Sequence, residues 1–332
     1  MNPPTLLSDT PGTFLTDPHA PDAPDVADVA VAPNGNILLL TRTPSLVTVF
    51  DASGRLLTQF GEQVFSARPH GIAVGDDGRV YVVDELAHAV WCFSPEGEVV
   101  ETLGTPGVAS QTGYVHAASM YDRCLSITTA APPFHRPTAI AIAPDGDRYV
   151  ADGYGNAAIH RFASDGTLIG SFGRPGTEPG AFRLPHALVV TAHDNVIVAD
   201  RENDRLQVFD RDGRVTDIIT DVQRPCALGQ DRDGSLYVGE LTWWPSDRSF
   251  RRGVTYLQSP ARISIFTSTG DLVARHVSPG DGTASGEFIA PHGLAVAKDG
   301  TVLLAEVAHS FCASRGIAEP QVNRFQRFRF GV

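Results

Sequence analysis

Residues 68–84 read Arg-Pro-His-Gly-Ile-Ala-Val-Gly-Asp-Asp-Gly-Arg-Val-Tyr-Val-Val-Asp, and this stretch recurs along the chain. It holds two short runs of β-favouring residues around an Asp-Gly turn, whose glycine takes the positive φ that a tight hairpin needs. Related copies begin near residues 25, 68, 136, 184, 224 and 290. The pattern therefore predicts six repeats of one small antiparallel unit.

Units of about 40 residues, each a small antiparallel meander, are typical of the blades of a β-propeller. We expect an all-β, six-bladed β-propeller, and we expect it to form a single domain over residues 1–332. The predicted blades are 25–64, 68–105, 136–174, 184–220, 224–278 and 290–330. Two insertions are predicted at 108–134 and 241–259. Long loops on a compact scaffold are often lids or binding loops, and surface decoration is the alternative.

The charge balance excludes some classes of function. The 332 residues include 26 Lys and Arg against 38 Asp and Glu, which gives a net charge of −12. Binders of nucleic acid or anionic membranes need a basic face, so neither kind of partner is expected. The first ten residues contain no basic residue and no apolar block, so we expect no secretory signal and a cytoplasmic location. The sequence gives no indication of the oligomeric state.

The spacing of the cysteines favours reduced thiols over a disulfide framework. The four residues, which show no close pairing, are Cys92, Cys124, Cys226 and Cys312.

One column of the aligned repeats carries histidine in every second copy. Its members are Ala27, His70, Thr138, His186, Cys226 and His292. Because the innermost strand of a blade lines the propeller channel, imidazoles from alternate blades would converge. Three neutral imidazoles with an open position are typical of catalytic zinc, and other divalent transition metals also fit. The alternative is that Pro-His is a strand-entry turn whose histidine fills the channel.

A second column, at the end of the second strand, is acidic in all but the first copy. Its members are Thr41, Asp84, Asp152, Asp200, Glu240 and Glu306. Such recurrence favours a structural role, in which the carboxylates cap backbone N–H groups of loops.

The residues that follow this column differ between copies, so the fold alone does not require them. Arg42 and Arg201 are candidate clamps for a substrate carboxylate, and a surface salt bridge is the alternative for each. Tyr154 stands between two glycines, which permit close approach of the backbone. It could present its phenol to the channel and act as a base.

At these residues the sequence resembles the peptidyl-α-hydroxyglycine α-amidating lyases, which are zinc-dependent propellers built from NHL repeats. Several segments carry the resemblance: Arg68-Pro-His-Gly-Ile, Arg136-Pro-Thr-Ala-Ile, Val150-Ala-Asp-Gly-Tyr-Gly-Asn, Phe182-Arg-Leu-Pro-His-Ala-Leu, Val198-Ala-Asp-Arg-Glu-Asn-Asp and Ala290-Pro-His-Gly-Leu. The resemblance spans roughly residues 27–309.

The resemblance implies zinc ligands at His70, His186 and His292, an essential tyrosine at Tyr154, and functional arginines at Arg42 and Arg201. The implied reaction splits an α-hydroxyglycine unit into an amide and glyoxylate. Tyr154 would take the hydroxyl proton and Arg42 would fix the carboxylate.

The sequence also departs from the family pattern. The family has methionine two residues before the third histidine and aspartate directly after it, where this chain has Ala290 and Gly293. That aspartate helps to hold a structural calcium ion, so structural Ca²⁺ is doubtful here. The family cysteine that follows the tyrosine is Gly155.

We therefore expect a metal-dependent lyase that acts on a small anionic carbinolamine, α-hydroxyglycine-like or ureidoglycolate-like. The sequence shows no copper monooxygenase domain that would make a peptidyl hydroxyglycine, which favours a small carboxylate substrate over a peptide. One alternative is a non-catalytic NHL propeller that binds a protein on its rim. Another is a metal-dependent hydrolase or elimination lyase on the same fold.

Overall fold

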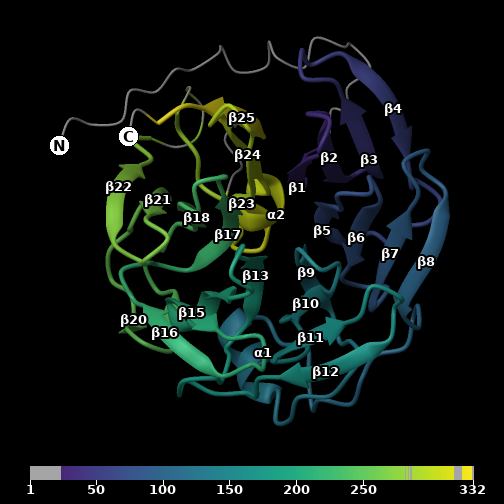
Figure 1. The fold of residues 1–332 in the computed structure, drawn as a ribbon. Helices are drawn as coiled ribbons and strands as arrows, with labels where there is room; N and C mark the ends of the chain where they lie inside the picture. Colours follow the sequence, from purple (N-terminus) through teal and green to yellow (C-terminus); the bar gives the residue numbers. More distant parts are fainter. Residues whose placement is uncertain (1–23, 281, 283, 285, 318–323, 331–332) are drawn as a thin grey trace. The chain divides into compact units, whose positions relative to one another are not determined.

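The structure is a computed structural model, and it describes residues 24–280, 282, 284, 286–317 and 324–330. The fold class is all-β, a six-bladed β-propeller, as expected. Each blade is an antiparallel sheet whose strands follow one another along the chain, as the colours of Figure 1 show from purple to yellow. Within the described residues, no helix combines the length and the apolar character that crossing a membrane requires.

The chain divides into two compact units, and each contains three blades. Unit A comprises the described parts of 1–67, 226–242 and 259–332, and unit B comprises 68–225 and 243–258. The expectation of a single domain stays a prediction.

In unit A, the last blade lies between the other two, because β23 packs against both β18 and β1. The elements are β1 Val26–Val31, β2 Ile37–Arg42, β3 Ser45–Phe50, β4 Leu56–Phe60, β17 Pro225–Gln230, β18 Leu236–Glu240, β21 Arg262–Phe266, β22 Leu272–Val277, β23 Pro291–Val296, β24 Val302–Glu306, β25 Phe325–Phe328 and helix α2 Ala308–Ala313.

In unit B, the blades lie side by side in chain order, because β9 packs against both β5 and β13. The blade strands are β5 Pro69–Val74, β6 Val80–Asp84, β7 Ala89–Phe93, β8 Val99–Gly104, β9 Pro137–Ile142, β10 Arg148–Asp152, β11 Ala158–Phe162, β12 Leu168–Phe172, β13 Pro185–Val190, β14 Val196–Asp200, β15 Arg205–Phe209 and β16 Val215–Ile219. The remaining elements are helix α1 Met120–Ser126, the 3₁₀ turn η1 Arg201–Asn203, β19 Arg248–Ser249 and β20 Gly253–Val254.

The burial of each strand follows its place in the blade. The second strands, such as β6 and β14, are buried along their whole length, and they are rich in β-branched residues that suit a pleated surface covered on both faces. The outermost strands, such as β12, are largely exposed. The turn between first and second strands depends on glycine, since Gly78 and Gly146 have φ of 80° and 88°.

Apolar side chains fill the space between neighbouring blades within each unit. One cluster joins the blade of β5–β8 to that of β9–β12, and another joins β9–β12 to β13–β16. Three phenylalanines, each three residues before a first strand, are fully buried: Phe134, Phe182 and Phe288. Burying one such side chain contributes about 1.5–3 kcal/mol. The segment that enters a blade is thereby fixed before the first strand begins.

The acidic column ties the end of each second strand to the segment that enters the blade. Asp152 accepts from the N–H of His135 (2.7 Å), and Asp200 accepts from the N–H of Arg183 (2.8 Å). Glu306 accepts from two successive backbone N–H groups, at 2.9 and 3.0 Å. The predicted capping role is confirmed at these three positions.

We predict that Glu306 makes stability depend on pH. Burial raises the pKa of this carboxyl group to about 7, against the two backbone N–H bonds that favour its charged form. The folded protein therefore holds a proton that the unfolded chain releases near pH 4.5. The stabilisation that this proton contributes is complete below pH 4.5, and it is lost as the pH rises through about 7. Glu306→Gln should show a smaller fall in Tm between pH 5 and pH 8.

The matched control for this measurement is Glu96→Gln, which changes an exposed carboxylate. It should retain the pH dependence of the wild type. Thermal denaturation across this pH range would contradict the prediction if Glu306→Gln lost as much stability with rising pH as the control. Asp200, whose pKa burial raises to about 6, leaves a residual dependence of the same sign in all three proteins.

Candidate metal and catalytic site

The column that contains the histidines corresponds to a β-bulge in the structure. In β5 the pairing with β6 moves from Pro69 directly to Gly71, and β13 and β23 skip His186 and His292 in the same way. A bulge leaves one residue outside the ladder and redirects its side chain. All three histidines are buried, with 2–7 % of their surface exposed.

Hydrogen bonds to the neighbouring blade fix two of these rings. His70 Nδ1 lies 2.7 Å from the carbonyl oxygen of Thr138, and His292 Nδ1 lies 2.6 Å from that of Ala27. A carbonyl oxygen only accepts, so Nδ1 carries the proton in both neutral rings. Nε2 then keeps its lone pair, which is the tautomer that a metal-binding histidine needs.

A glycine follows two of the histidines because the neighbouring blade comes too close for a side chain. A Cβ atom on Gly71 would lie 2.6 Å from the carbonyl oxygen of Thr138. A Cβ atom on Gly293 would lie 2.5 Å from the Cα atom of Asp28. The packing at Gly293 therefore has no room for the aspartate that the resemblance associates with structural calcium.

The three predicted ligands form a group that could hold a metal ion. The ligand atoms of His70, His186 and His292 all lie within 4.8 Å of one another, and each residue is buried. The group consists of neutral nitrogen donors, and carbonyl bonds orient two of its rings. This donor set suits a borderline divalent metal better than a hard oxygen-seeking cation.

Tyr154 contacts two of these histidines, His70 and His186, and all three residues lie in unit B. Its hydroxyl oxygen lies 3.2 Å from His186 Nε2 and 3.3 Å from His70 Nε2. Nη1 of Arg201 donates to the same oxygen at 3.2 Å. The structure thus brings four of the six predicted site residues into one buried network, since Tyr154 is 9 % and Arg201 is 4 % exposed.

The two glycines beside Tyr154 allow its backbone to sit against two other segments. A Cβ atom on Gly153 would lie 2.2 Å from the carbonyl oxygen of Pro185, and one on Gly155 would lie 2.4 Å from the ring of His135. The Tyr154 N–H donates to the carbonyl of Arg136 (3.2 Å). The sequence predicted that the glycines allow close approach of the backbone. This close approach to Pro185 and His135 positions the Tyr154 phenol.

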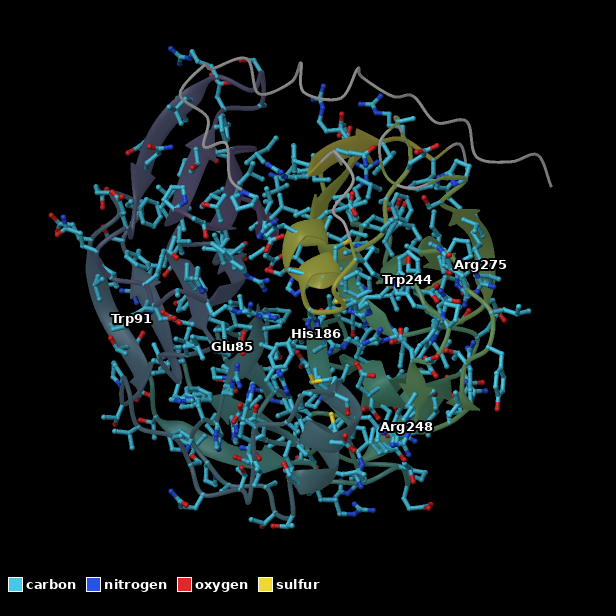
Figure 2. The ribbon with its side chains drawn as sticks, turned by 180° about the vertical axis from the view of Figure 1, so that it is seen from behind. Glu85, Trp91, His186, Trp244, Arg248 and Arg275 are labelled. Atoms are coloured by element: carbon cyan, nitrogen blue, oxygen red, sulfur yellow. The ribbon has the colours of Figure 1, made fainter. Side chains whose placement is uncertain are left out.

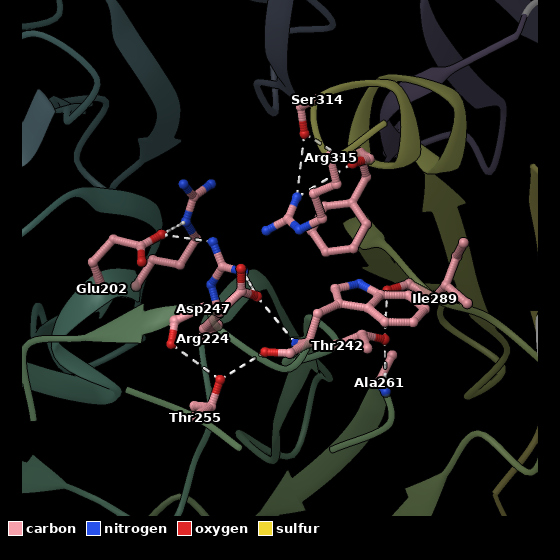
Figure 3. Close-up of polar contacts among 12 residues, drawn as sticks. Glu202, Arg224, Thr242, Asp247, Thr255, Ala261, Ile289, Ser314 and Arg315 are labelled. Atoms are coloured by element: carbon pink, nitrogen blue, oxygen red, sulfur yellow. Dashed lines mark hydrogen bonds and ion pairs between the residues drawn. The ribbon is translucent and has the colours of Figure 1, made fainter. Parts of the chain in front are cut away.

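Arg201 is held by a carboxylate that it shares with a second arginine. It lies in η1, and its Nε donates to Glu202 Oε1 at 2.8 Å. Nη2 of Arg224 donates to the same oxygen at 3.0 Å, and Figure 3 shows this link between Glu202 and Arg224. Burial raises the pKa of Glu202, but the charges of Arg224 and Arg201 outweigh burial and hold its pKa below the usual value. The carboxylate stays ionised and fixes both guanidinium groups.

Arg42 lies in unit A, at the C-terminal end of β2. Its guanidinium is buried and lies 3.9 Å from the carboxylate of Asp25. It is not the exposed surface salt bridge that the sequence left open as an alternative. Its role as a carboxylate clamp stays a prediction.

Sequence reasoning missed Glu202 and Arg224 as parts of the site. Glu202 directly follows a predicted residue, yet nothing in its neighbours indicated that it would bridge two arginines. Arg224 precedes the proline of a first strand, as Arg68 and Arg136 do. The recurrence is a signal that could have been used, because Arg68 and Arg136 also share one carboxylate, that of Glu85.

We predict that the protein binds about one Zn²⁺ per chain and that His70→Ala and His186→Ala each abolish this binding. Each change removes one of three neutral nitrogen donors. Tyr154→Phe should keep the metal, because it leaves all three imidazoles in place. Metal analysis after dialysis against zinc gives the stoichiometry. His193→Ala, which removes an exposed histidine, is the matched control. A wild-type protein that stayed well below one metal per chain would refute the assignment.

The sequence profile of the NHL repeat matches residues 67–93 and 182–209, which contain His70 and His186. The chain is 27% identical over 273 residues to peptidyl-glycine alpha-amidating monooxygenase B of Xenopus laevis, a match that covers 80% of this chain and 28% of that protein. It is 30% identical over 178 residues to peptidyl-alpha-hydroxyglycine alpha-amidating lyase 1 of Drosophila melanogaster, covering 51% and 30%. The chain thus spans less than a third of the length of these two relatives.

Two solved structures share the fold. A streptogramin B lyase has a TM-score of 0.59 at 13% identity, covering 94% of this chain and 96% of that one. A catalytically inactive virginiamycin B lyase from Staphylococcus aureus has a TM-score of 0.56 at 12% identity, covering 99% and 89%. At such identities the likeness concerns the fold alone. By sequence, the chain carries NHL repeats and is similar to the peptidyl-α-hydroxyglycine α-amidating lyases.

Proposed function

We propose that the protein is a metal-dependent lyase that cleaves the C–N bond of a small anionic carbinolamine. One observation supports this proposal more than any other. The Tyr154 hydroxyl lies within hydrogen-bonding distance of two imidazole nitrogens and one guanidinium at a single buried point. A proton-transferring group, an anion-binding group and metal-ligating groups therefore act on one small volume.

The proposed reaction moves one proton from oxygen to nitrogen, in two transfers, and needs no redox step. The substrate has the form R–NH–CH(OH)–COO⁻, where R is an acyl or carbamoyl group. Its hydroxyl loses a proton, the C–O bond becomes a carbonyl, and the electron pair of the C–N bond leaves with nitrogen. Nitrogen takes up a proton, so the products are R–NH₂ and glyoxylate.

We assign the metal to His70, His186 and His292, and we propose Zn²⁺ as its identity. When bound, such an ion supplies Lewis acidity that favours loss of the hydroxyl proton. The protein contributes the orientation of the rings, because the carbonyl groups of Thr138 and Ala27 hold two of them by Nδ1. Metal-binding histidines typically donate the N–H of their other ring nitrogen in this way, which fixes the orientation of the ring.

In this proposal Tyr154 moves the proton. Its hydroxyl donates its own proton to the departing nitrogen while its oxygen accepts the proton of the substrate hydroxyl, so the phenol is restored at the end of the step. Arg201 holds the phenol in place, because Nη1 donates to the Tyr154 oxygen and the guanidinium carbon lies 5.4 Å from the centre of the tyrosine ring. Tyr154 and Arg201 are buried, which strengthens the electrostatic interactions between them.

Arg201 also suits the charge of the substrate. Glu202 shares its negative charge between Arg201 and Arg224, and the carboxylate of Asp247 lies 3.5 Å from Nη1 of Arg224. In the proposed complex, the carboxylate of the substrate pairs with the guanidinium of Arg201. We propose Arg42 as a second clamp for the carboxylate.

The names of two relatives favour a lyase over a rim-binding scaffold. The similar proteins of Drosophila melanogaster and Caenorhabditis elegans are named as α-amidating lyases that act on peptidyl-α-hydroxyglycine. A scaffold that binds a partner on its rim would have no use for a buried Tyr–Arg–His network. Charged and polar groups are costly to bury, and a network of this kind is a typical place for catalysis.

We predict that Tyr154→Phe lowers kcat by at least about 100-fold, because it removes the group that transfers the proton. The assay measures release of glyoxylate from N-acetyl-α-hydroxyglycine and from ureidoglycolate by the zinc-loaded protein. Tyr149→Phe is the matched control, since Tyr149 is a buried tyrosine of β10 outside the network. Equal turnover in Tyr154→Phe and the wild type would remove Tyr154 from the mechanism. A wild type that bound zinc but released no glyoxylate from either compound would refute the proposed reaction.

We predict that Glu202→Gln lowers kcat/KM about 10- to 100-fold, because Arg201 loses the charge that orients it. The effect should appear mainly as a higher KM for the carboxylate substrate, while zinc binding stays at the wild-type level. Glu178→Gln, at an exposed site, is the control. Wild-type kinetics in Glu202→Gln would show that Arg201 is oriented without this carboxylate.

A further inference from the structure

The first insertion covers Tyr154 within unit B. Helix α1 contributes Cys124 to a buried cluster with Tyr154 and Leu184, and Met120 and Phe250 pack against this cluster. Ser119 caps the helix by accepting from the N–H of Asp122 (3.1 Å). A short helix is thus placed directly over the residue to which we assign proton transfer.

The second insertion reaches the first through an aromatic contact. Phe250 lies in the turn between β19 and β20, and its ring stacks on that of Tyr121 of α1, with centroids 4.1 Å apart and an interplanar angle of 14°. The guanidinium carbon of Arg248, a residue labelled in Figure 2, lies 4.0 Å from the centre of the Tyr121 ring. Two segments that lie more than a hundred residues apart in sequence therefore form one cover.

Arg183 connects this cover to the scaffold. Its Nη1 donates to the carbonyl oxygen of Cys124 at the end of α1 (2.7 Å), and its guanidinium carbon lies 5.0 Å from the centre of the Phe250 ring. Its own backbone N–H is held by Asp200. One side chain thus touches both halves of the cover.

The hairpin of β19 and β20 is anchored next to Arg201. Ser249 Oγ donates to Asp204 Oδ2 at 2.6 Å, and Asp204 is the residue that ends η1. Arg251 donates to the carbonyl oxygens of Asp204 and Thr220, at 3.1 and 2.7 Å. The hairpin is therefore held on the blade of β13–β16 at its turn, by residues on both sides of Phe250. Phe250 itself meets α1 through the ring stack with Tyr121, and both rings are partly exposed.

We propose that α1 and the β19–β20 hairpin form a gate over Tyr154, and that the Tyr121–Phe250 contact is its latch. Hydrogen bonds hold the turn of the hairpin on the scaffold, while the latch depends on the ring stack and on two cation–π contacts, Arg248 with Tyr121 and Arg183 with Phe250. The gate therefore opens at the latch by movement of α1, because the turn of the hairpin stays bound to the blade of β13–β16. This inference rests on the proposed function, and it adds that the gate selects substrates by the size of their N-substituent.

The closed gate favours small substrates. Cys124, Leu184 and Tyr154 are each less than a tenth exposed, so the space beside the phenol is filled when the latch is shut. A carbamoyl or acetyl group needs a small displacement of α1. A peptide chain on the same nitrogen needs the two insertions to separate. Weakening the latch should therefore relax the selection in favour of longer N-acyl groups.

Cys124 offers a readout of the gate that does not depend on activity. It is the buried residue of α1, and burial raises the pKa of its thiol. Both features make its reaction with N-ethylmaleimide slow while the gate is shut. In Tyr121→Ala and Phe250→Ala, labelling of Cys124 should be about tenfold faster, which corresponds to about 1.4 kcal/mol of opening free energy. Peptide mass spectrometry separates Cys124 from Cys92, Cys226 and Cys312.

The matched control is Tyr256→Ala, which removes an aromatic ring of the same insertion that is 83 % exposed. It should label at the wild-type rate. Tyr121→Leu and Phe250→Leu are milder variants, which keep the site filled if an alanine variant does not fold. Labelling of Cys124 at the wild-type rate in the folded latch variants would overturn the gate.

The selectivity of the gate is tested with two substrates of the zinc-loaded protein, N-acetyl-α-hydroxyglycine and an N-acetylated tripeptide that ends in α-hydroxyglycine. The ratio of kcat/KM for the peptide to that for the small substrate should rise about tenfold in the latch variants and stay constant in Tyr256→Ala. Faster labelling with an unchanged ratio would overturn size selection. Faster labelling in a protein that is inactive on both substrates would uphold the gate and refute the proposed reaction.

Discussion

The site depends on a hydrogen bond between blades. His70 Nδ1 donates to the carbonyl oxygen of Thr138, and His292 Nδ1 donates to that of Ala27. In each pair the acceptor is the bulge residue of the neighbouring first strand. The bond therefore forms only when adjacent blades pack at the distance that Gly71 and Gly293 permit. The packing that stabilises the fold also sets the tautomer that leaves Nε2 able to bind a metal.

The histidines and the arginines of the site are buried in different ways. The imidazoles are neutral and carry no desolvation penalty for a full charge, so they can be buried without counter-ions. The arginines need a partner, and Glu202 supplies one negative charge to two of them. A buried carboxylate that stays ionised between two guanidinium groups is consistent with its lowered pKa.

Repeated features could be predicted from the sequence, as could single residues beside them such as Tyr154 and Arg201, but the contacts between the two insertions could not. The period of the repeat placed the histidines at one structural position, and the flanking glycines indicated the close approach of Tyr154. Asp-Gly turns and β-branched runs were enough to predict the blades. The contact between Tyr121 and Phe250 has no such signal, because neither insertion follows the repeat. Nothing local in either segment indicates that the two would meet, since long-range contacts between loops depend on the scaffold that carries them.

This difference between repeated and unrepeated parts has a functional consequence. A repeat supplies equivalent positions, so it suits a task that needs several copies of one side chain, such as ligation of a metal by three imidazoles. Proton transfer and the choice of substrate need single groups. Tyr154, Arg201 and the two insertions all lie where one blade departs from the others. A chain of this kind can change its substrate by altering the insertions, because the bulges and inter-blade bonds that orient the histidines lie in the strands and would remain intact.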